Sequence, residues 1–203
     1  VYCDEVIPVI RKQIPESVIL VGTPEFDRNL GSAVLRPLPY DNVMAVLHFY
    51  ATTHGQGLLE ELQAAVESGL PVFISEWGIS EASGDGDLNF HMAAQWFDYL
   101  NRNSIGYAVW SLSDKNESSA IFRPRFEPDE PIRDADLTVS GRWVKALISG
   151  EDPQTIPYPA PTLEKGRMAE LCSFLSSALG ERGTSTMHAW PVFACIGLLA
   201  VLM

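Results

Sequence analysis

Short apolar runs typical of buried strands alternate with amphipathic helical segments over the first 150 residues of this chain. Each strand and helix together take roughly 25 to 30 residues, which is the spacing of βα repeats and of a parallel sheet. The predicted strands cover residues 18–22, 42–50, 71–78 and 105–112, and the predicted helices cover residues 4–13, 58–68, 89–103 and 140–148. Four such units amount to half of an eightfold barrel, so we predict an α/β fold of the (β/α)8 TIM barrel type.

The sequence also predicts where this pattern is interrupted. Residues 23–40 contain three prolines and are predicted as a long loop around a short helix, and residues 122–135 are predicted as a loop rich in proline and charge. Pro8 is expected to kink the first helix. Gly69 is expected to end the helix at 58–68 in the C′ position. The strand at 18–22 is expected to be buried.

The charge balance excludes some classes of function. The chain has 14 Lys and Arg against 26 Asp and Glu, a net charge of −12, and no basic run. We therefore expect no nucleic-acid partner, because phosphates would be repelled. The three cysteines have neither zinc-site nor CxxC spacing, and the four histidines are scattered. No metal and no cofactor is predicted.

The strand at 71–78 ends in Ser75-Glu76-Trp77-Gly78. An acid at the carboxyl end of a parallel strand faces the mouth of a sheet or barrel, where these folds keep their chemistry. Glu76 is therefore the first candidate for a catalytic residue. The alternative is a loop glutamate that caps the next helix.

Polar and aromatic residues also end the strands on either side. His48 and Tyr50 share one face of the strand at 42–50, because strand side chains alternate, while Leu47 and Phe49 share the other. Tyr50 is thus placed to hydrogen-bond the Glu76 carboxylate and favour its charged form. The strand at 105–112 has Trp110 near its carboxyl end, and Lys115 and Glu117 follow it. A retaining glycosidase needs such a set, which comprises an ionised carboxylate, donors that orient it and an aromatic platform for sugar. Each residue alone has a structural alternative.

Three ordered segments, residues 42–50, 75–78 and 110–120, together resemble the second half of a glycoside hydrolase family 5 cellulase of the bacterial endoglucanase type. The resemblance covers about residues 2–148. It implies strands 5 to 8 of the TIM barrel, and a secreted, metal-independent hydrolase that cleaves internal β-1,4 bonds of a β-glucan by double displacement. Mannan and xyloglucan stay open as substrates, because the fold and the nucleophile do not fix the sugar.

The resemblance also implies residue roles. Glu76 corresponds to the nucleophile that attacks the anomeric carbon, and His48 and Tyr50 correspond to the pair that holds it and lines the cleavage subsite. The implied sugar contacts are Trp110, Lys115, Glu117 and Ala82 on the glycone side and Phe26, in place of a tryptophan, on the aglycone side. For His54 a sugar-binding role and a loop-structural role are both open.

The family's general acid/base is the glutamate of an Asn-Glu-Pro motif, and that motif does not occur in this chain. Retaining hydrolysis needs two carboxyl groups about 5 to 5.5 Å apart. We therefore expect a C-terminal fragment that lacks its N-terminal half-barrel, is inactive alone, and aggregates or pairs through its open edge strands. The alternative is a catalytically incompetent carbohydrate-binding remnant at a cell surface.

The chain is expected to divide into a half-barrel at 1–149, a linker and spacer rich in proline and serine at 150–188, and an apolar tail at 189–203. Small residues at 176–178, a mostly polar spacer and the apolar end follow the order of a glycolipid-anchor signal. The tail is short against the roughly 20 residues of a membrane-spanning helix. A tail packed on the protein and translation past an unrelated boundary are the alternatives. The expected location is extracellular, with membrane contact only through such an anchor.

If the tail is an anchor signal, a phosphatidylinositol-specific phospholipase should release the protein from the surface of a eukaryotic host. The enzyme cleaves the lipid and leaves the polypeptide intact, so immunoblotting of the supernatant measures the release. Retention on the cells after this treatment would contradict the anchor.

Overall fold

The computed structural model describes residues 2–127 and 131–156. Within them, four parallel strands form one sheet in the order β1-β2-β3-β4. The strands are β1 (Ile19–Val21), β2 (Val43–Tyr50), β3 (Val72–Gly78) and β4 (Tyr107–Val109). The α-helices are α1 (Tyr2–Gln13), α2 (Pro24–Asp27), α3 (Gly31–Leu35), α4 (Gln56–Glu67), α5 (Phe90–Arg102) and α6 (Val139–Ser149), and the 3-10 helices are η1 (Asp134–Asp136) and η2 (Pro153–Thr155). Sequential parallel strands joined through helices confirm the predicted α/β fold.

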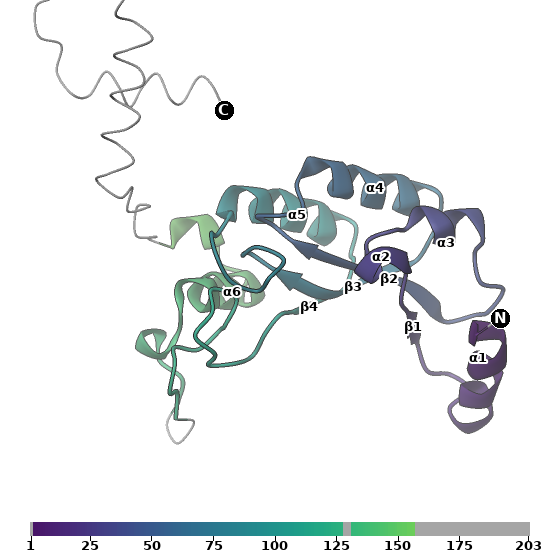
Figure 1. The fold of residues 1–203 in the computed structure, drawn as a ribbon, viewed down its shortest axis with the longest axis horizontal. Coiled ribbons are helices and arrows are strands. Elements are labelled where there is room, and N and C mark those ends of the chain that lie inside the picture. Colours follow the sequence, from purple (N-terminus) through teal and green to yellow (C-terminus); the bar gives the residue numbers. More distant parts are fainter. Residues whose placement is uncertain (1, 128–130, 157–203) are drawn as a thin grey trace, which may run out of the picture. The chain divides into compact units, whose positions relative to one another are not determined.

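The core lies between the sheet and the helices α4 and α5, which run along one side of it (Figure 1). Leu47 and Phe49 of β2 are fully buried there. The Phe49 ring stacks on Trp96 of α5, with ring centroids 4.0 Å apart, and Trp77 of β3 packs edge-on against Phe97 at 4.4 Å. The predicted alternation is confirmed at the end of β2, since Leu47 and Phe49 lie on the face that packs against the helices and His48 and Tyr50 lie on the other face.

Strand pairing sets the neighbours at the carboxyl edge of the sheet. In the register of β2 with β3, His48 lies opposite Glu76 and Tyr50 opposite Gly78. A Cβ on Gly78 would lie 2.7 Å from the Tyr50 ring, so only glycine lets the tyrosine side chain occupy this place. The residues from two distant chain segments are thereby brought side by side.

Two strands differ from the prediction. Leu20 of β1 is 42% exposed, so the expectation of a buried strand is wrong. The reason is that β1 is the edge of the described sheet, and its only strand neighbour there is β2. β4 ends at Val109 rather than at residue 112, because the chain leaves the sheet there. Trp110 N still donates to Trp77 O at 2.8 Å, but Ser111 N turns to Ser119 O.

Capping side chains and a glycine set several of the helix ends. Asn89 caps α5 by accepting from Met92 N, and Thr138 caps α6 by accepting from Gly141 N. Gly69 has φ +86°, as its predicted C′ position after α4 requires. Pro8 lies inside α1, which is a single helix of 12 residues.

The segments predicted as loops and linker contain more structure than expected. Residues 23–40 hold two short helices, α2 and α3. Within the predicted linker, η2 contacts α5 and α6, so this part packs on the domain. The remaining linker, the predicted helix within 162–179 and the apolar tail lie outside the described residues. In the part that is described, no helix is both long and apolar enough to cross a bilayer.

Two glycines in helices provide a test of this packing. A Cβ on Gly141 would overlap the backbone carbonyl of Ile121, which cannot move without shifting the chain. A Cβ on Gly57, inside α4, would meet nothing within 4 Å. We expect Gly141→Ala to lower the free energy of unfolding by about 1 to 3 kcal/mol. Gly57→Ala should raise it by about 0.5 to 1 kcal/mol, because alanine is the better helix former. Urea denaturation measures both, and equal midpoints for Gly141→Ala and the parent would contradict the packing of α6.

Candidate active site

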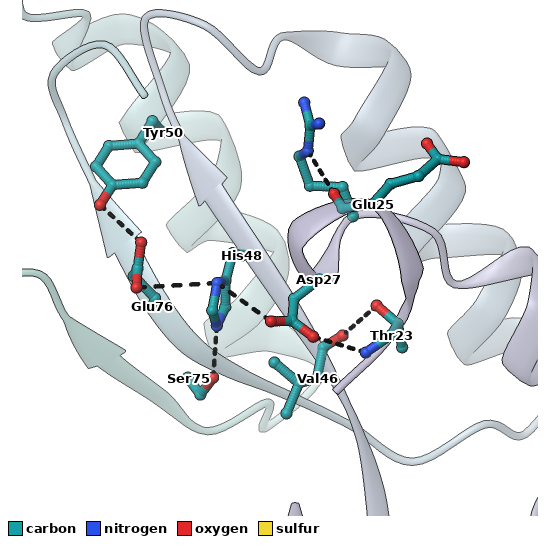
Figure 2. Close-up of polar contacts among 9 residues, drawn as sticks. Thr23, Glu25, Asp27, Val46, His48, Tyr50, Ser75 and Glu76 are labelled. Carbon is teal, nitrogen blue, oxygen red and sulfur yellow. Dashed lines mark hydrogen bonds and ion pairs between the residues drawn. The ribbon is translucent and has the colours of Figure 1, made fainter. Parts of the chain in front are cut away.

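Glu76, Tyr50 and His48 meet at the carboxyl ends of β2 and β3 (Figure 2). The Tyr50 hydroxyl donates to Glu76 Oε1 at 2.8 Å, which is the hydrogen bond that the sequence predicted. The second carboxylate oxygen, Oε2, lies 3.9 Å from His48 Nδ1. That separation is beyond hydrogen-bond length. One oxygen of Glu76 is therefore fixed by the phenol, and the other has only a longer electrostatic contact with the imidazole.

Tyr50 is suited to a permanent donor role. Burial raises the pKa of its phenol well above the usual value, and the hydrogen bond to Glu76 and the negative charges of Glu76 and Glu117 raise it further. The hydroxyl consequently keeps its proton throughout the ordinary pH range and points it at the Glu76 carboxylate. A neutral donor held in place in this way orients the carboxylate without cancelling its charge.

His48 has polar neighbours on both ring nitrogens. Its Nε2 lies 2.8 Å from the Ser75 hydroxyl. Its Nδ1 faces two carboxylates, Asp27 Oδ2 at 3.6 Å and Glu76 Oε2 at 3.9 Å. Sequence reasoning missed Asp27 and Ser75. The rule that selected Glu76, an acid shortly after a strand, also applies to Asp27 and β1, but the prolines around it led to a loop prediction.

These groups open into a cavity of about 500 Å3. Its lining includes the predicted residues Glu76, His48, Tyr50, Phe26, His54 and Ala82, together with Asp27 and Arg28. Phe26 is 86% exposed, and the guanidinium of Arg28 lies 5.9 Å from its ring centroid. An exposed aromatic ring beside a carboxylate pair is the kind of surface that a sugar ring can stack on.

His54 holds the loop after β2. Its Nδ1 accepts from Tyr50 N at 2.8 Å, and its carbonyl accepts from Trp96 Nε1 at 3.3 Å. Burial lowers the pKa of the imidazole, and the charge of Arg28, whose Nη1 is 3.4 Å from Nε2, lowers it further. The contacts of His54 are thus those of the loop-structural alternative, although its ring also lines the cavity.

Lys115 and Glu117 line a second cavity of about 410 Å3 with Asp85, Ser118 and the start of α6. Lys115 Nζ is 3.9 Å from Glu117 Oε1. Asp85 Oδ1 accepts from both the backbone nitrogen and the hydroxyl of Ser118, and these bonds hold the pKa of the Asp85 carboxyl below its usual value. The predicted polar sugar contacts Lys115 and Glu117 therefore line this second cavity. The two loops that form it are joined by the hydrogen bonds between Asp85 and Ser118.

Trp110, the predicted sugar platform, is 41% exposed and belongs to the lining of neither cavity. Its role as a platform stays a prediction. Over residues 2–127 and 131–156, no group of three or more His, Cys, Asp or Glu side chains is arranged to hold a metal ion.

The class of protein follows from this fold and this site together with a comparison of families. Residues 1–116 match the family described as Cellulase (glycosyl hydrolase family 5), and the chain belongs to this family. The family assignment confirms the resemblance found in the segments around His48, Glu76 and Trp110.

Curated relatives are bacterial endoglucanases. Endoglucanase A of Evansella cellulosilytica is 38% identical over 161 residues, which cover 79% of this chain and 33% of that protein. Endoglucanase A of Butyrivibrio fibrisolvens is 40% identical over 149 residues, covering 73% of this chain and 34% of that protein. The chain thus spans about a third of the length of the curated relatives it matches.

Solved structures give the same fold. A GH5 cellulase from an Icelandic hot spring isolate superposes with a TM-score of 0.72 at 34% identity, covering 77% of this chain and 51% of that one. The catalytic domain of Thermobifida fusca endoglucanase Cel5A in complex with cellotetraose has a TM-score of 0.69 at 34% identity, covering 73% and 51%. The four-stranded sheet is therefore part of a (β/α)8 barrel, as predicted.

The lowered pKa of His54 makes stability depend on pH. The unfolded chain binds a proton at His54 near the usual pKa of 6.5, whereas the folded chain resists it, so protons favour unfolding. We expect the free energy of unfolding to fall as pH drops below about 6.5. His54→Asn keeps an acceptor for Tyr50 N and should remove part of this dependence, measured by urea denaturation at several pH values. His91→Asn, on the exposed side of α5, is the matched control and should retain it. The same slope in both variants would contradict the assignment.

Proposed function

We propose that this domain supplies the nucleophile side of a retaining endo-β-1,4-glucanase, with Glu76 as the nucleophile. The observation that carries the proposal is the geometry of the Glu76 carboxylate. Its Oε1 accepts from Tyr50 at 2.8 Å, its Oε2 has no hydrogen-bond partner among the described residues, and the side chain lines a cavity at the carboxyl ends of parallel strands. Barrel enzymes keep their catalytic groups at this end of the sheet.

In the proposed reaction, Glu76 Oε2 attacks the anomeric carbon of a bound glucan. A C–O ester bond forms, and the bond from the anomeric carbon to the leaving oxygen breaks with its electron pair. Water later hydrolyses the ester and restores Glu76. Tyr50 keeps Oε1 in place through both steps, so the attacking oxygen is presented in one orientation.

The leaving oxygen needs a proton from a second carboxyl group about 5 to 5.5 Å from the first. The chain contains no Asn-Glu-Pro sequence to supply it in the way the family does. The chain also covers about half of the solved catalytic domains. We propose that the second carboxyl group comes from barrel strands outside this sequence, and that full activity belongs to the complete barrel.

The proposed substrate is a β-1,4-glucan. Support comes from the endoglucanase relatives and from the Thermobifida fusca catalytic domain, which was solved with cellotetraose. The exposed Phe26 ring and the Lys115 and Glu117 side chains are the proposed sugar contacts on this chain. A glucan polymer does not pass through a membrane, so the proposed place of action is outside the cell.

A substrate analogue with a fluoride leaving group tests Glu76 in this chain directly, because fluoride leaves without a proton. 2-Deoxy-2-fluoro-β-cellobiosyl fluoride should form a stable ester on Glu76, detected by mass spectrometry of the peptide that contains it. Glu76→Gln keeps the shape but removes the nucleophilic charge, and we expect labelling to fall by roughly 1,000-fold or more. Glu60→Gln, an exposed acid on α4, is the matched control and should be labelled like the parent.

The same protein should release no reducing sugar from carboxymethyl-cellulose, since the natural leaving oxygen must be protonated. Joined to the N-terminal barrel half of the Butyrivibrio fibrisolvens relative, it should cleave that polymer, and Glu76→Gln should abolish the cleavage. Hydrolysis by the unjoined chain would contradict the need for a second carboxyl group. A joined barrel that binds β-glucans and mannans but cleaves neither would favour a carbohydrate-binding remnant instead.

A further inference from the structure

The turn that follows β1 is α2, and its backbone is not that of a regular right-handed α-helix. Glu25, Phe26 and Asp27 have φ of 62°, 60° and 59°, which is the left-handed region. Residues with a side chain rarely adopt this region, and three in succession are rarer still, because the Cβ atom approaches the following carbonyl. Strained backbone of this kind persists where the surrounding contacts hold it, and it is concentrated at functional sites.

Polar contacts hold the turn against β2. Thr23 N donates to Asp27 Oδ1 at 2.6 Å, and the Thr23 hydroxyl donates to Val46 O of β2 at 3.0 Å. A Cβ on Gly22 would lie 2.8 Å from Asp27 Oδ1, so a glycine at the end of β1 leaves room for the carboxylate. The turn therefore positions the Asp27 side chain beside His48, near the end of β2 (Figure 2).

Only one oxygen of Asp27 is needed to hold the turn. The other, Oδ2, lies 3.6 Å from His48 Nδ1, and Glu76 Oε2 lies 3.9 Å from the same nitrogen. The three side chains are about equally shielded, with exposed fractions of 25%, 22% and 26% for Asp27, His48 and Glu76. The imidazole is thus enclosed between two carboxylates in a partly desolvated place.

This arrangement selects a tautomer of the neutral imidazole. Both carboxylates lie beyond hydrogen-bond length from Nδ1, but their negative charges favour a hydrogen on the nitrogen that faces them. Nε2 is then the acceptor, and the Ser75 hydroxyl at 2.8 Å donates to it. Asp27 is the closer of the two carboxylates to Nδ1.

We propose that Asp27 is a positioning residue whose negative charge, 3.6 Å from Nδ1, holds His48 in the Nδ1–H tautomer. In that tautomer the positive end of the N–H dipole faces Glu76 Oε2 from 3.9 Å, which orients the attacking oxygen without hydrogen-bonding it. The effect on attack rests on the proposed function of Glu76, whereas the tautomer of His48 does not. The two parts of the proposal are therefore tested by different measurements.

Asp27→Asn separates the charge of this residue from its part in the turn. The asparagine carbonyl oxygen still accepts from Thr23 N, but its NH2 group now faces His48 Nδ1 with donors. We expect the proton to move to Nε2. Nitrogen-15 NMR of the histidine rings at alkaline pH, where free imidazole is neutral, distinguishes the two tautomers. The His48 signals are those lost in His48→Gln.

Asp98→Asn, an exposed acid that pairs with Arg102 on α5, is the matched control and should leave the His48 signals unchanged. An Nε2–H tautomer in the parent protein, or the same tautomer in the parent and in Asp27→Asn, would overturn the proposal.

The labelling reaction with the fluorinated cellobiosyl fluoride measures the effect on attack. In Asp27→Asn the maximal rate of labelling should fall roughly 10-fold to 100-fold. The concentration of the analogue that gives the half-maximal rate should change less, because the orientation of Glu76 is lost and the binding of the analogue is not. The thermal midpoint should stay at the parent's value. A purely structural role predicts the opposite result, in which Asp27→Asn is labelled at the parent's rate and only Asp27→Ala is impaired and less stable. If the tautomer moves without a change in rate, the effect on attack is overturned.

Absence of labelling in the parent protein as well would count against Glu76 as the nucleophile, and thus against the proposed function. It would leave the tautomer of His48 to be decided by NMR alone.

Discussion

The backbone pairing of β2 with β3 is the constraint on which the rest of this structure depends. It sets His48 opposite Glu76 and Phe49 opposite Trp77. Because strand side chains alternate, this register sends Phe49 and Trp77 into the core while His48 and Tyr50 stay on the other face. A slip by one residue would exchange the two faces. The stacking of Phe49 on Trp96 therefore secures the position of the polar site as well as the core.

The polar site concentrates negative charge, and the donors that hydrogen-bond its two carboxylates are neutral. Asp27 and Glu76 face the same imidazole nitrogen, and the charge of Glu117 is felt at Tyr50. Tyr50 and the backbone nitrogen of Thr23 each satisfy one carboxylate oxygen. Neutral donors leave the carboxylates charged, in contrast to an arginine partner that would neutralise them. A site of this kind is suited to nucleophilic attack on a neutral sugar more than to binding an anion.

Much of this architecture was predictable from local pattern. The predicted helix at 58–68 differs from α4 by only a residue or two at each end, and the predicted helix at 89–103 begins at Asn89, the residue that caps α5. The predicted burial of β1 and the predicted end of β4 were wrong, because both depend on which segments lie beside these strands in the fold. Leu20 is apolar and in a strand, yet exposed, since β1 lies at the edge of the described sheet. β4 stops at Val109 because the following residues bond to a loop instead of continuing the sheet.

The sequence by itself determined the parallel βα order, the shared face of His48 and Tyr50, and the place of Glu76 at a strand end. Those features follow from the period of two along a strand and from the alternation of element types, which are local properties. Only the tertiary structure decided that Asp27 and Ser75 contact His48, and that Lys115 and Glu117 line a cavity separate from that of Glu76. The physical reason is that these contacts depend on a left-handed turn and on the register between distant strands. Neither leaves a periodic signal in the residues themselves.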